Sequence, residues 1–115
     1  MNSEDSTSNN GVLDTSFYVL PRCGEGELLM QQLKERLTKV RLCYSVNRIE
    51  YEINTLKVIT RLYGVDIVYS KVAKCINNLL EIVEAEYLDI FGDNIDKKFI
   101  RLVKLVFEIL WMAIA

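Results

Sequence analysis

From Glu27 to the last residue, apolar side chains recur at spacings of three and four residues, which places them on one side of an α-helix. The pattern falls into four segments separated by short links: residues 27–46, 49–63, 66–91 and 95–115. Asn47 and Gly64 are expected to end the first two helices, Asp66 to cap the third, and residues 92–94 to form the last turn. The sequence therefore predicts an all-α fold, either a four-helix antiparallel bundle or a stacked helical array.

The first 26 residues have a different character. They begin with a run rich in Ser and Asn, and "SFYVL" at positions 16–20 has the composition of a β-strand. Since no second strand is expected, we interpret it as an extended segment that packs Phe17, Tyr18 and Leu20 onto the helices. A free peptide arm for a partner is the alternative. We divide the chain into a disordered or extended arm, residues 1–26, and a helical partner-binding domain, residues 27–115.

The helical spacing also predicts which side chains face inward. In the first helix these are Leu29, Leu33, Leu37, Val40 and Tyr44. In the second they are Ile49, Ile53, Leu56, Ile59 and Leu62 or Tyr63. In the third they are Val68, Val72, Cys75 or Ile76, Leu79, Ile82 or Val83, and Leu88. In the fourth they are Phe99, Leu102 or Val103, Val106, Ile109 or Leu110, and Ala113.

The residue content leaves little room for catalysis. The chain has no histidine, which removes the commonest general base and metal ligand, and it has no glycine-rich phosphate loop or nucleophile beside a base. Cys23, Cys43 and Cys75 are odd in number and irregularly spaced, which favours reduced thiols in an intracellular compartment. The net charge of −2 does not favour nucleic acid. We therefore expect a binding or regulatory module, not an enzyme, with no cofactor and no metal.

The last helix carries more apolar surface than a four-helix domain needs. Between Arg101 and Glu108, apolar residues point in nearly every direction, whereas a surface helix has a stripe a little over about 100° wide. A membrane span is excluded on length, because only seven uncharged residues close the chain and a span needs about 20. We therefore expect Phe107, Trp111 and Ile114 to contact a partner, with Ile109, Leu110 and Ala113 turned inward.

Basic side chains gather in two places. One set lies on the first helix and the following turn, and the other lies in the first turns of the last helix. Lys34, Lys39 and Arg48 represent the first, and Lys97, Arg101 and Lys104 the second. Each set is a candidate contact for microtubules or another acidic partner, although most such stripes are simply solvated.

The stretch "RLTKVRLCYSVNRIEYEINTLKVI" resembles the start of the C-terminal helical domain (con80) of the katanin regulatory subunit, p80. The family has an Arg, then Val-Arg-x-x-Trp, a polar turn and Ile. Here Arg36, Val40, Arg41, Tyr44 in the Trp place and Ile49 stand at matching positions. "LLEIVEAEYLDIF" is similar to the family's next long helix, and residues 99–110 to the one after. This chain matches a short form best, such as the nematode meiotic regulatory subunit.

This resemblance implies a non-catalytic subunit that heterodimerises with the N-terminal helical domain of the katanin AAA ATPase (p60 type) and promotes microtubule severing. It implies a cytoplasmic, cytoskeletal or spindle location and a partner contact through Arg36, Arg41 and Tyr44. Two alternatives remain open from the residues alone. One is a Bcl-2-like or other small helical protein that binds an amphipathic helix, and the other is a homo-oligomeric helical bundle.

Overall fold

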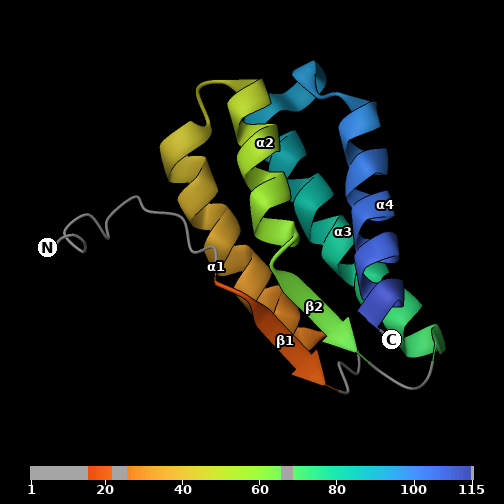
Figure 1. Ribbon diagram of the computed structural model, residues 1–115. Coiled ribbons are helices and arrows are strands. Elements are labelled where there is room, and N and C mark those ends of the chain that lie inside the picture. Colours follow the sequence, from red (N-terminus) through yellow and green to blue (C-terminus); the bar gives the residue numbers. More distant parts are fainter. Residues whose placement is uncertain (1–15, 22–25, 66–68, 115) are drawn as a thin grey trace, which may run out of the picture.

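The computed structural model describes residues 16–21, 26–65 and 69–114. The elements follow in the order β1 Tyr18–Pro21, α1 Glu27–Tyr44, α2 Arg48–Ile59, β2 Leu62–Val65, α3 Tyr69–Phe91, a 3₁₀ turn η2 Gly92–Asn94, and α4 Lys97–Ile114. Figure 1 shows the four helices running alternately up and down, so that α2 and α4 point the same way. The predicted four-helix architecture is therefore confirmed.

The helix ends agree with the prediction at some points and differ at others. Asn47 caps α2, and its side chain accepts a hydrogen bond from the Glu50 amide at 3.1 Å. α2 ends at Ile59, five residues before Gly64, so the expectation that Gly64 ends this helix is wrong. The predicted cap Asp66 lies outside the described residues. Gly26 precedes α1 with φ +86°, and a Cβ there would lie 2.4 Å from Cys75 Sγ, so both conformation and space require glycine.

The "SFYVL" segment does have a partner strand, which the sequence analysis missed. β1 pairs in parallel with β2, with Tyr18 opposite Leu62 and Pro21 opposite Val65. The Tyr18 amide donates to the Arg61 carbonyl at 2.8 Å. β2 was hidden because its four residues, "LYGV", continue the apolar spacing of the helix before them. The pairing ties the end of the N-terminal arm to the helices, as Figure 1 shows.

The buried core draws on all four helices. From α1 come Leu29, Leu33, Leu37 and Val40, which are fully enclosed as the helical spacing predicts. α3 contributes Val72, Cys75, Ile76, Leu79, Val83 and Tyr87, and α4 contributes Phe99, Val103, Phe107 and Trp111. Leu88, predicted inward, is instead exposed on α3, and Tyr87 occupies the core position beside it.

Candidate interaction surface

α4 is rotated relative to the expected orientation. Phe107 and Trp111 have no exposed surface, the Phe107 ring packs edge-on against Trp111 at 5.5 Å, and Trp111 Nε1 donates to the Leu62 carbonyl at 2.8 Å. The partner contact predicted for these two side chains is therefore wrong in this fold. The side chains of Ala113 and Ile114, also assigned a direction, lie outside the described part of the chain. Exposed instead are Leu102, Leu105 and Ile109. Of the pair Leu102 or Val103, Val103 is the buried one, while Ile109 was expected inside.

α2 is turned in a similar way. Its buried face is Tyr51, Asn54, Thr55, Val58 and Ile59, while Ile49 and Ile53, predicted inward, are exposed. The cause is Tyr51, whose ring stacks on Tyr87 with centroids 6.1 Å apart and meets Phe91 edge-on at 5.3 Å. Seating this large ring against α3 turns the isoleucines to the opposite side of the helix.

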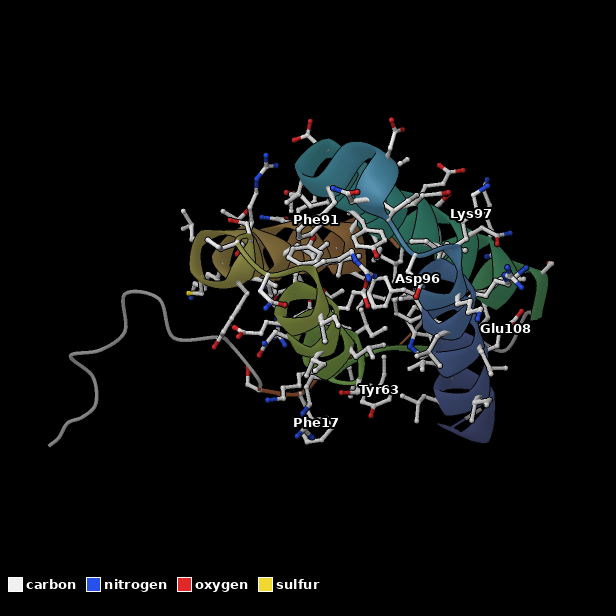
Figure 2. All side chains as sticks on the ribbon, turned by 90° about the horizontal axis from the view of Figure 1, so that it is seen from above. Phe17, Tyr63, Phe91, Asp96, Lys97 and Glu108 are labelled. Carbon is white, nitrogen blue, oxygen red and sulfur yellow. The ribbon has the colours of Figure 1, made fainter. Side chains whose placement is uncertain are left out.

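The two exposed stripes lie on the same side of the molecule. Figure 2 looks down α2 and α4 from their N-terminal ends and shows Lys97 and Glu108 on the side of α4 away from α2. Successive residues of a helix are turned by about 100°, so the exposed residues Leu102, Leu105 and Ile109 lie about a quarter turn clockwise from Glu108 in this view. They are therefore on the side of α4 where Phe17 and Tyr63 are labelled. Ile49 and Ile53 are opposite Tyr51 and so also point away from α3. We define the outer α2–α4 face as Ile49, Ile53, Leu102, Leu105 and Ile109, which are 42% to 58% exposed.

A polar cluster connects α2, α3 and the start of α4 behind this face. Arg48 Nη1 lies 2.6 Å from Glu52 Oε2 and 3.9 Å from Asp96 Oδ2. The Tyr87 hydroxyl donates to Glu52 and accepts from the Asp96 amide at 2.8 Å. Burial, and then the hydrogen bond to the Glu52 carboxylate, raise the pKa of Tyr87. The cluster therefore fixes α2 relative to α4, and with it the geometry of the outer α2–α4 face.

The residues that the katanin resemblance assigns to partner binding have internal roles here. Arg36 is buried at 3% exposure, and its guanidinium donates to the Ser16 carbonyl at 2.6 Å. Arg41 bridges α1 to α3 through Glu86 and Asp89, both at 2.8 Å, and these hydrogen bonds raise its pKa. Tyr44 is half-buried against the core. Of the three, only Arg36 is fully buried, whereas Arg41 and Tyr44 are partly exposed.

The predicted basic residues do not form one continuous patch. Arg48 belongs to the polar cluster just described. Lys39 is exposed on α1, and Lys34 lines an open groove of about 530 Å³ between α1 and α3 that also contains Ile82, Glu86 and Asp89. Lys97, Arg101 and Lys104 are all exposed on α4, as the helical spacing indicated.

Sequence reasoning missed the polar cluster because Glu52, Tyr87 and Asp96 come from three different elements and share no spacing. The described residues contain no group of three or more acidic or cysteine side chains placed to hold a metal ion. Within that same part of the chain, no helix is long and apolar enough to cross a membrane.

Comparisons with protein-family models, with curated proteins and with solved structures found no match to this chain. The interpretation of the surface therefore rests on its own geometry.

Proposed function

We propose that this chain is a non-catalytic protein-interaction domain whose outer α2–α4 face binds an amphipathic helix of another protein. The observation that supports the proposal is the exposure of five large aliphatic side chains on two neighbouring helices that point the same way. Large apolar side chains exposed together on one side of a soluble protein are typical of a protein contact. Two adjacent helices also provide the shape on which a third, amphipathic helix packs through residues spaced three and four apart.

The internal contacts behind the face favour a rigid docking surface. The polar cluster of Arg48, Glu52, Tyr87 and Asp96 spans three elements, and Trp111 connects α4 to β2. A partner would therefore bind without first ordering the helices, which lowers the entropic cost of association.

The resemblance to the katanin regulatory domain supplies a specific candidate for the partner. On this proposal the chain heterodimerises with the N-terminal helical domain of the severing ATPase and promotes severing at the spindle or elsewhere in the cytoskeleton. The ATPase chemistry belongs to the partner. Lys97, Arg101 and Lys104 are exposed on α4, the helix that carries part of the face, and are then the candidates for a microtubule contact.

The Bcl-2-like alternative gains less support from the fold. That architecture requires a central helix covered on all sides, whereas each of the helices α1 to α4 has exposed residues along its length. The general proposal of a helix-binding surface does not depend on the choice between these families.

Calorimetric titration of the chain with the ATPase N-terminal domain tests the proposal. Leu102 on the face and Leu88 on α3 form a matched pair, since both are leucines within helices and are 42% and 43% exposed. Leu102→Ser should weaken binding about tenfold or more because it removes an apolar contact at the interface, while Leu88→Ser should leave the affinity unchanged. Absence of binding by the wild-type chain would remove the katanin assignment. Equal effects of the two substitutions would place the contact elsewhere.

A further inference from the structure

Along one edge of the apolar stripe of α4, a positively charged side chain is followed by a negatively charged one. Leu102, Leu105 and Ile109 form the stripe, and Arg101 and Glu108 flank it on one side, seven residues apart. Seven residues are two helical turns, or about 10.5 Å along the axis. Both side chains are exposed, and neither has an ion-pair partner among the described residues. Lys97 and Lys104 lie on the same side of α4 but farther from the stripe, so Arg101 and Glu108 are the two charged side chains of this edge that are nearest to it.

The charges on this edge of α4 are complementary to those of a second α4 helix that runs in the opposite direction. If two α4 helices lie antiparallel with their stripes in contact, the same edge of both helices falls on one side of the interface. Arg101 of each copy then faces Glu108 of the other, and a two-fold axis makes both ion pairs identical. A parallel arrangement brings no such pairs together.

From this complementarity we propose that two copies of the chain associate through antiparallel contact of their α4 helices. Leu102 of one copy lies beside Leu105 of the other at the centre of the interface. Lys98 continues the stripe toward its N-terminal end, so its aliphatic stem covers Ile109 of the second copy while its ammonium group approaches Glu108. Because α2 is next to α4, Ile49 and Ile53 come to lie at the border of the same contact.

The pairing uses part of the face on which the proposed partner helix would dock. A heterologous partner therefore competes with the second copy, and the homodimer is the state of the free chain. The inference itself does not require the proposed function, since the charges and the stripe are present whatever the partner is.

Charge exchange tests the pairing. Static light scattering on the whole wild-type chain should give a dimer of about twice the 13.3 kDa chain mass. Arg101→Glu or Glu108→Arg alone places like charges together twice and should weaken the dimer by on the order of tenfold. The double variant carrying both exchanges restores both pairs with opposite polarity and should recover the wild-type dissociation constant. Lys39→Glu makes the same change of charge at an exposed position on α1, away from the pairing, so it is the control and should change little.

Three results would overturn the pairing. They are a wild-type monomer at all concentrations, a dimer insensitive to the single exchanges, and a double variant no stronger than the singles. Circular dichroism of each variant checks that the helices are intact, which the exposure of both side chains predicts. A dimer that passes this test while the ATPase domain fails to bind would leave the pairing in place and contradict only the specific partner.

Discussion

The stacked rings of Tyr51 and Tyr87 carry hydroxyl groups that contribute differently to the stability of the fold. Tyr51 and Tyr87 stack in the core, yet the Tyr87 hydroxyl has Glu52 and the Asp96 amide as partners, while the buried Tyr51 hydroxyl lies near the buried Thr55 hydroxyl of the same helix, without the geometry of a good hydrogen bond. Burial raises the pKa of both phenols. The Tyr87 hydroxyl therefore connects three elements, whereas the Tyr51 hydroxyl connects α2 to no other element and recovers less of the cost of its desolvation.

Removing each hydroxyl should consequently have opposite effects on the free energy of unfolding. Tyr87→Phe leaves Glu52 and the Asp96 amide without their partner and should cost about 1–3 kcal/mol. Tyr51→Phe keeps the ring stacking and removes an unsatisfied group, so stability should be unchanged or slightly higher. Urea denaturation of the two variants measures both. Equal losses would show that the Tyr51 hydroxyl has a partner in solution.

Individual helices show how far apolar spacing alone can predict a fold. In α1 the apolar residues form one stripe, and Leu29, Leu33, Leu37 and Val40 are buried as predicted. α4 is apolar in nearly all directions, so spacing could not select the inward face. That choice depends on the Trp111 bond to Leu62, in a strand the sequence did not reveal.

In α2 the spacing predicted the burial of Ile59 correctly, but it was wrong for Ile49 and Ile53 because it treats all apolar residues alike. Tyr51 finds two aromatic neighbours on α3, and this stacking decides the rotation over Ile49 and Ile53. Stacking between distant elements is a tertiary effect, as is the pairing of β1 with β2. The exposed interaction surface could therefore be predicted as an excess of apolar residues, but not by its members.

Trp111 was predicted to contact a partner, but the structure shows it fully buried between helix and strand. If Trp111 were exposed on a surface that contacts a partner, its replacement would have little effect on folding. As a fully buried ring that donates to β2, its replacement by alanine leaves a large cavity and an unpaired carbonyl. Trp111→Ala should destabilise the domain by about 3–5 kcal/mol, measured by thermal or urea unfolding. A variant that unfolds like wild type would mean that α4 is rotated in solution.

At the scale of the whole molecule, five aromatic side chains lie in the interior, while the outer α2–α4 face is aliphatic. Phe99, Phe107, Trp111, Tyr51 and Tyr87 fill the interior, while the outer α2–α4 face carries only isoleucine and leucine. The polar cluster holds α2 and the start of α4 in place beneath this face, and the Trp111 hydrogen bond to Leu62 connects α4 to β2. On the proposals made above, this face is where the chain contacts another protein chain, and in a purified sample the available partner is a second copy.

The most direct test of that claim is the molar mass of the chain by light scattering, compared between Leu102→Ser and Leu88→Ser over a series of concentrations. We expect a dimer for wild type and for Leu88→Ser, and a shift toward monomer for Leu102→Ser, because only Leu102 lies on the outer α2–α4 face. A dimer that survives Leu102→Ser unchanged, or one lost equally in both variants, would contradict it.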